Sequence, residues 1–151
     1  EYEVYQMHFN RDECMKNSDC SCLDLSRVVQ NYADETIIRV NALACPLPRL
    51  CTSFVRRRKK QIAIYQNKAV LMLAPFEDGV FNMAKVPLKS LHLTGEAIDV
   101  YDPDGKLKKW VKEHEIRLDA LGLWCEDFAS TPTWVHFQTR PPKSGKRFFK
   151  P

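Results

Sequence analysis

The sequence lacks a hydrophobic run long enough to cross a membrane, and it lacks repeats and low-complexity segments. No signal peptide is visible either, but the chain opens on Glu1 rather than methionine, so the missing leader gives no information about location. The 151 residues, 44% of them hydrophobic, are enough for one core. We therefore expect a single domain over residues 1–151, in which residues 1–23 could form an irregular N-terminal extension.

Recognised nucleic-acid-reading motifs and an aromatic-rich binding sheet are also missing. The net charge of +4 favours approach to anionic polymers, which include cell-wall material and nucleic acid. Five consecutive cations, residues 56–60, are the strongest indication of nucleic acid because they would neutralise several phosphates. They lead straight into Gln61–Tyr65, which reads as a helix, so a solvated helix start is the simpler interpretation. We expect no nucleic-acid partner.

Standard zinc-binding cysteine spacings are absent as well, because Cys14, Cys20 and Cys22, with His8, match none of them. The six cysteines are an even number, and Cys45 and Cys51 could close a disulfide loop around Pro46 and Pro48 in an oxidising compartment. Free thiols in a reducing cytosol are the alternative. The sequence does not decide between the two.

What the sequence does contain is an imidazole and a carboxylate only a few residues apart. The alternating pattern of residues 96–100 predicts a strand that directs Asp99 away from the core. Gly95 before this strand permits a sharp turn that brings His92 back over it. We therefore expect His92 and Asp99 to lie close enough for one metal ion to contact both.

A second alternating segment, residues 133–138, offers a third ligand. On this predicted strand Val135 and Phe137 face the core and His136 points the other way. Antiparallel pairing of the two strands would set His136 beside Asp99. Two histidine nitrogens and one aspartate oxygen suit zinc, and three protein ligands leave a position open for water, as in catalytic sites.

Together the two segments resemble a family of zinc peptidases that includes D-alanyl-D-alanine carboxypeptidases, peptidoglycan endopeptidases and the hedgehog signalling domain. The shared pattern is Ser-x-His-x-x-Gly-x-Ala-x-Asp followed by Trp-x-His, carried here by Ser90, His92, Gly95, Ala97, Asp99, Trp134 and His136. The first motif is specific, whereas Trp-x-His gains its value from order and distance. The resemblance runs from near Thr52 to the end of the chain. It implies an α+β fold, in which a small antiparallel sheet is flanked by helices and zinc is held in an open cleft.

The resemblance also implies a ligand set and an arginine. His92, Asp99 and His136 would hold Zn2+. A family segment, Ser-Gly-Tyr/Phe-Arg, supplies an arginine that contacts substrate or the oxygen that develops charge. This chain reads Ser53-Phe54-Val55-Arg56, which keeps the serine and the arginine but not the glycine and the aromatic residue. Arg56 is therefore the expected arginine, with Arg57 and Arg58 as alternatives.

The expected catalytic base is Glu126. Many relatives carry an acidic residue three positions before the final histidine, where this chain has Thr133. The nearest acids upstream are Glu126 and Asp127, on what reads as the loop entering the His136 strand. Glu126 has the longer reach and is preferred, with Asp127 second. A pair of solvated loop carboxylates is the alternative.

The resemblance implies hydrolysis of peptide bonds in peptidoglycan stem peptides, as a D,D- or L,D-carboxypeptidase or an endopeptidase. Ser90, Trp134 and Gln138 are expected to bind substrate, although Gln138 could equally be a polar residue of the rim. The expected protein is a monomer without a membrane span, and it is periplasmic or extracellular, or phage-encoded and cytoplasmic before lysis. The alternatives are a catalytically silent relative that binds metal or wall peptide, and a basic nucleic-acid-binding module.

Two helices and an edge strand complete the expected fold. Residues 24–44 have apolar residues at helical spacing, including Val28, Tyr32 and Val40, and Pro46 ends the segment. A single helix is predicted from Lys106 to Leu121, with His114 packed or half exposed in its apolar stripe. The tail, residues 141–149, ends in a short extended run that could add an edge strand.

Overall fold

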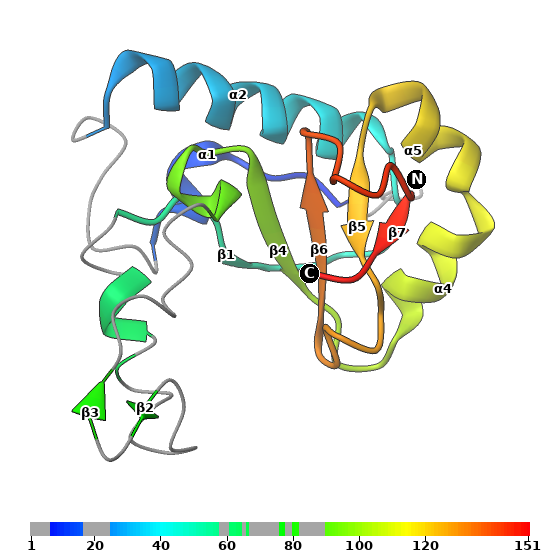
Figure 1. Ribbon diagram of the computed structural model, residues 1–151. Coiled ribbons are helices and arrows are strands. Elements are labelled where there is room, and N and C mark those ends of the chain that lie inside the picture. The colour runs from blue at the N-terminus through cyan, green and yellow to red at the C-terminus, as the bar shows by residue number, and fades with distance from the viewer. Residues whose placement is uncertain are drawn as a thin grey trace.

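A five-stranded sheet with helices at its edges forms the body of the protein (Figure 1). The computed structural model describes residues 7–16, 25–57, 61–64, 66, 76–77, 80–81 and 90–151. The strand order is β1 (Cys51–Ser53), β4 (Ala97–Tyr101), β6 (Trp134–Gln138), β5 (Trp124–Glu126) and β7 (Phe148–Phe149). Neighbouring strands are antiparallel except β5 and β7, which are parallel. The expected α+β class with a small, mostly antiparallel sheet is confirmed, and β7 is the expected edge strand. A second, two-stranded sheet joins β2 (Phe76–Glu77) to β3 (Val80–Phe81).

The two central strands bury one face in the core, as their alternation predicts. Ile98 and Val100 on β4 and Val135 and Phe137 on β6 are fully buried in one apolar cluster. Residues between them along each strand point to the opposite face, because successive side chains of a strand alternate. The polar residues of these strands therefore share one face of the sheet.

Helix α2 (Arg27–Ala42) begins three residues later than the sequence predicted. Ser26 caps it, since its Oγ atom accepts a hydrogen bond from the backbone N–H of Val29 at 3.3 Å. Its buried face consists of Ala33, Thr36, Ile37 and Val40. Val28 and Tyr32, which were predicted on the core stripe, are 62% and 43% exposed. The predicted stripe was too wide because it took in apolar residues that flank the true contact face.

The same helix crosses the end of the sheet where β4 and β5 begin, as Figure 1 shows. Thr36 donates its hydroxyl to the Gly95 carbonyl at 2.7 Å, and Arg39 donates to the Gly122 carbonyl at 3.1 Å. Gly95 has φ +82°, and a Cβ there would lie 2.9 Å from the Val29 carbonyl oxygen. The turn that precedes β4 can approach α2 this closely only because it carries a glycine.

The helix predicted from Lys106 to Leu121 is two helices, α4 (Lys106–Glu113) and α5 (Glu115–Leu121). They meet at His114, whose φ of −123° and ψ of 33° are not helical. The His114 ring donates from Nδ1 to the Trp110 carbonyl at 2.7 Å, so the backbone N–H bonds to Val111 instead. The side chain thus takes the acceptor that a continuing helix would use. His114 also stacks on Trp110 and is a packed residue.

Residues 7–16, within the expected N-terminal extension, contribute to the core. Residues 7–16 contain the one-turn helix α1 (Arg11–Cys14), which begins at the N-cap Asn10. Four side chains of this segment are in the core: Met7, Phe9, Cys14 and Met15. Met7 also donates its backbone N–H to the Cys45 carbonyl at 2.7 Å. This segment is therefore packed onto the same core as the sheet.

Of the two alternatives for Cys45 and Cys51, the disulfide is not formed: both are free thiols, as are Cys14 and Cys125. The neighbour of Cys51 is Cys14: a hydrogen bond between them, followed by burial, raises the pKa of Cys51. Cys45 instead lies fully buried in the core. For the four cysteines of the described chain, the alternative of free thiols therefore holds. Cys20 and Cys22 lie outside the described residues.

The structure describes only part of the run of five cations at residues 56–60. Arg56 and Arg57 are described, residues 58–60 lie outside the described residues, and residues 61–64 are helical as expected. Across the described ranges, none of the helices has the length and apolar character needed to span a membrane.

Candidate metal centre

Polar side chains form a row across four neighbouring strands. Ser53 on β1 pairs with Asp99 on β4, and Asp99 pairs with His136 on β6. On the far side of β6, Cys125 pairs with Phe137, so Glu126 lies next to His136. Residues in register on neighbouring strands point to the same face. The predicted antiparallel pairing of Asp99 with His136 is confirmed, and the row includes Glu126.

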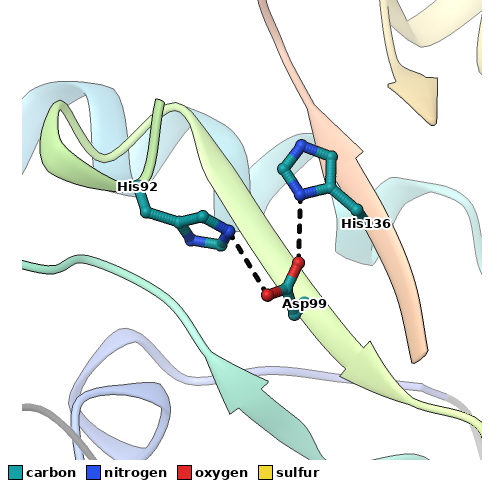
Figure 2. A group of neighbouring side chains, drawn as sticks. All are labelled: His92, Asp99 and His136. Carbon is teal, nitrogen blue, oxygen red and sulfur yellow. Dashed lines mark hydrogen bonds and ion pairs between the residues drawn. The ribbon is translucent and has the colours of Figure 1, made fainter. Parts of the chain in front are cut away.

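A short 3-10 turn, η3 (Leu91–Leu93), adds His92 to this row. Ser90 caps the turn, since its Oγ atom accepts the His92 backbone N–H at 3.3 Å. After Gly95 reverses the chain, the His92 Nε2 atom lies 3.3 Å from the Asp99 Oδ2 atom (Figure 2). The glycine of the sequence motif thus places the imidazole over the strand that follows it.

Three possible ligand atoms meet at this point. The His136 Nδ1 atom lies 3.0 Å from Asp99 Oδ1, and one ligand atom from each of His92, Asp99 and His136 lies within 4.8 Å of the others. All three residues are buried. Two ligands of one tetrahedral zinc ion are about 3.3 Å apart when each bond is about 2.0–2.1 Å long. The two separations are near this value, although His92 faces Asp99 Oδ2 and His136 faces Asp99 Oδ1. The three residues are therefore close enough that they could hold a metal ion.

Neighbouring side chains shift the pKa values of Asp99 and His136. Burial alone would raise the pKa of Asp99, but the charge of His92 and the hydrogen bond from His136 outweigh it and lower that pKa well below its usual range. For His136, burial lowers the pKa, while the hydrogen bond and charge of Asp99, with the charge of Glu126, raise it above the ordinary value. Without metal, the pair is therefore a carboxylate beside an imidazole that readily holds a proton. A metal ion would replace that proton.

Arg56 enters the site from the β1 side. A register shift in β1 between Cys51 and Ser53 alters the course of the chain just before it. The Arg56 Nε atom donates to Ser53 Oγ at 3.0 Å, and Nη1 donates to Gln61 Oε1 at 3.1 Å. Its Nη2 atom lies 3.6 Å from Asp99 Oδ2. The guanidinium is thus held in place beside the Asp99 carboxylate. The sequence did not predict a role for Gln61, whose contact with Arg56 is local and forms at the start of the helical residues 61–64.

Glu126 enters from the opposite side of the row, and it belongs to strand β5 rather than to the predicted loop. Its Oε1 atom lies 3.8 Å from His136 Nδ1. The next acid, Asp127, points elsewhere and accepts hydrogen bonds from the backbone and side chain of Ser130. Thr133, at the position where many members of the family that the motif resembles carry an acid, is exposed. Strand alternation therefore brings Glu126 and not Asp127 to the cluster.

All eight sequence-predicted site residues line one open cleft of about 830 Å3: Arg56, Ser90, His92, Asp99, Glu126, Trp134, His136 and Gln138. Another wall of the cleft, which the sequence did not predict, comes from the C-terminal tail through Pro142, Lys143, Phe149 and Lys150. The tail reaches the cleft because β7 pairs with β5 next to Glu126. This long-range pairing leaves no local signal in the sequence.

Comparison of the chain with protein-family models, with curated proteins and with solved structures finds no match in any of the three. The resemblance to zinc peptidases accordingly rests on the motif residues themselves and on where the fold places them.

Proposed function

We propose that this protein is a zinc-dependent peptidase that hydrolyses peptide bonds in the stem peptides of peptidoglycan. The observation that carries the proposal is the convergence of His92, Asp99 and His136 in a cleft that holds a carboxylate on one side and a guanidinium on the other. A purely structural zinc site is closed by four protein ligands, whereas three ligands facing a cleft suit catalysis.

Zinc is the metal that the ligand types support. Two imidazoles and one carboxylate form a borderline donor set, which favours zinc over the all-oxygen sites of magnesium and calcium. When bound in such a site, zinc polarises a carbonyl and lowers the pKa of water to about 7. The protein's own groups then have to orient the peptide, accept a proton and balance the developing charge.

We assign the movement of that proton to Glu126. Its carboxylate adjoins the His136 ligand atom and lines the cleft, so it can accept a proton from an attacking water and return it to the leaving amine. We assign the balance of the developing charge to Arg56. Its guanidinium is held by Ser53 and Gln61 and offers a fixed set of donors to an oxyanion or a substrate carboxylate.

The proposed substrate class agrees with the charge of the cleft walls. Arg56, Lys143 and Lys150 all line it, and cations attract the free carboxylates that peptidoglycan stem peptides carry. Trp134 and Ser90 add an aromatic surface and a hydroxyl near the ligands. This substrate would place the protein's activity at the bacterial cell wall.

Metal content and cleavage test the proposal together. Chelator-free protein is loaded with zinc, its metal is measured by mass spectrometry, and it is incubated with isolated peptidoglycan peptides. We expect about one zinc per chain and new peptide termini. His92→Ala should lose both, whereas the matched variant His114→Ala, which alters a packed histidine between α4 and α5, should keep both. No stoichiometric zinc after loading would overturn the proposal. Zinc without cleavage would indicate the catalytically silent relative instead.

A further inference from the structure

The ring nitrogen of His136 that faces away from Asp99 has a side-chain partner. His136 Nε2 lies 2.9 Å from the Oε1 atom of Gln138, two residues along β6. The amide nitrogen of Gln138 donates to the Arg140 carbonyl at 2.7 Å. A carbonyl can be approached only by a donor, so this contact fixes which end of the amide faces His136. That end is the oxygen.

The amide oxygen determines where the imidazole keeps its proton. An amide oxygen can only accept a hydrogen bond, so His136 Nε2 must carry the hydrogen. In neutral imidazole the other nitrogen, Nδ1, then has the free lone pair. Nδ1 is the atom 3.0 Å from Asp99 and thus the atom that the metal site requires.

The main chain that orients Gln138 is itself anchored. The Arg140 guanidinium makes two hydrogen bonds with the carboxylate of Glu96, at 3.0 and 2.9 Å, and Glu96 is only 4% exposed. Thr139 donates its backbone N–H to the Glu96 carbonyl at 3.0 Å. The segment after β6 is therefore tied to the start of β4. The Arg140 carbonyl is held where the Gln138 amide needs it.

His92 is oriented in a different way. Its Nδ1 atom is 2.7 Å from the backbone carbonyl of Phe54, which leaves Nε2 to face Asp99. A backbone acceptor is present whatever the side chain, so this contact does not depend on residue type. The orientation of His136, by contrast, depends on one side chain.

We infer that Gln138 is a positioning residue that selects the metal-binding tautomer of His136 through the Gln138–Arg140 hydrogen bond. The inference rests on the proposed metal site. It gives Gln138 a role other than substrate contact, and its burial agrees with this, since only 7% of it is exposed. Such partners of ligating histidines commonly contribute 10–100-fold to metal affinity.

Zinc affinity, measured by competition with a chelator, tests the inference without any substrate. Gln138→Leu keeps the approximate volume and removes the acceptor, so we expect zinc binding about 10–100-fold weaker than in the wild type. Gln138→Glu retains an acceptor oxygen and should bind zinc more tightly than Gln138→Leu. Gln30→Leu is the matched control, because it also removes one side-chain-to-backbone hydrogen bond, on α2, and it should leave the affinity unchanged.

A measurement on the unaltered protein covers the case in which Gln138→Leu fails to fold. Nitrogen NMR of the zinc-loaded wild type should show His136 bound to zinc through Nδ1 and protonated at Nε2. Zinc on Nε2, or equal affinities of the wild type and Gln138→Leu, would overturn this inference and leave the proposed function standing. A wild type that binds no zinc would overturn both.

Discussion

Glu126 on β5 lies beside His136 on β6, with its Oε1 atom 3.8 Å from the His136 Nδ1 atom, while the adjacent Asp127 bonds to Ser130. If Glu126 is the general base, Glu126→Gln should lower kcat for peptide cleavage by about 10²–10⁴-fold and retain zinc. Asp127→Asn is the matched control, one residue along the chain, and should cleave at nearly the wild-type rate. Full cleavage by Glu126→Gln would remove that residue from the mechanism.

Arg56 should matter for turnover and not for metal binding. Arg56→Ala removes a guanidinium that lines the cleft 3.6 Å from Asp99, and we expect kcat to fall by about 10²–10³-fold if it stabilises an oxyanion. Zinc content should not change. Arg57→Ala, at the next and exposed position, serves as the comparison. Steady-state kinetics with unchanged kcat and KM in Arg56→Ala would make Arg56 a structural residue that supports Ser53 and Gln61.

Gly95 is required for close packing as well as for its backbone conformation. Gly95→Ala would place a Cβ 2.9 Å from the Val29 carbonyl oxygen, whereas Gly105, which also has positive φ, has open space around it. Gly105→Ala should therefore cost only the left-handed backbone penalty, about 1–2 kcal/mol. Gly95→Ala should lower the free energy of unfolding by more than this in urea titrations. Equal losses in the two variants would mean that α2 moves aside freely.

The His136–Asp99 pair predicts opposite pH trends without and with zinc. Because the pKa of His136 is raised, its contribution to metal-free stability is fully present below the ordinary value of about 6.5 and is lost as pH rises through the higher folded value. Asp99 stays ionised over this range because its pKa is lowered. The stabilisation that added zinc confers should instead increase with pH, since a ligating imidazole must be deprotonated.

Urea unfolding of the metal-free wild type and His136→Asn between about pH 5.5 and pH 8.5 measures the first trend, and the same titration of the wild type with added zinc measures the second. The difference in unfolding free energy between the two proteins should shrink as the pH of the metal-free samples rises. His114→Asn, which alters a histidine outside the cluster, should not reproduce this change. Parallel pH profiles for the wild type and His136→Asn would contradict the charge coupling.

The strands that carry Asp99 and His136 were predictable because their five-residue alternation is long enough to show a period of two. The three residues of β5 are too few for this, so Glu126 was assigned to a loop although it lies on a strand. The prediction of a single helix from Lys106 to Leu121 was wrong for another reason. Its apolar spacing continues through His114, but the His114 side chain takes a backbone acceptor and breaks the helix.

The sequence by itself determined the ligand types, their order along the chain and the face to which each points, because these depend on residues within one strand or one turn. Only the tertiary structure decided that Glu126 and the C-terminal tail reach the same cleft, and that Cys51 meets Cys14 rather than Cys45. These contacts depend on how strands pair and on how α2 and the tail pack against them. Local periodicity carries no information about such pairings, because they are selected by the burial and hydrogen bonding of the whole core.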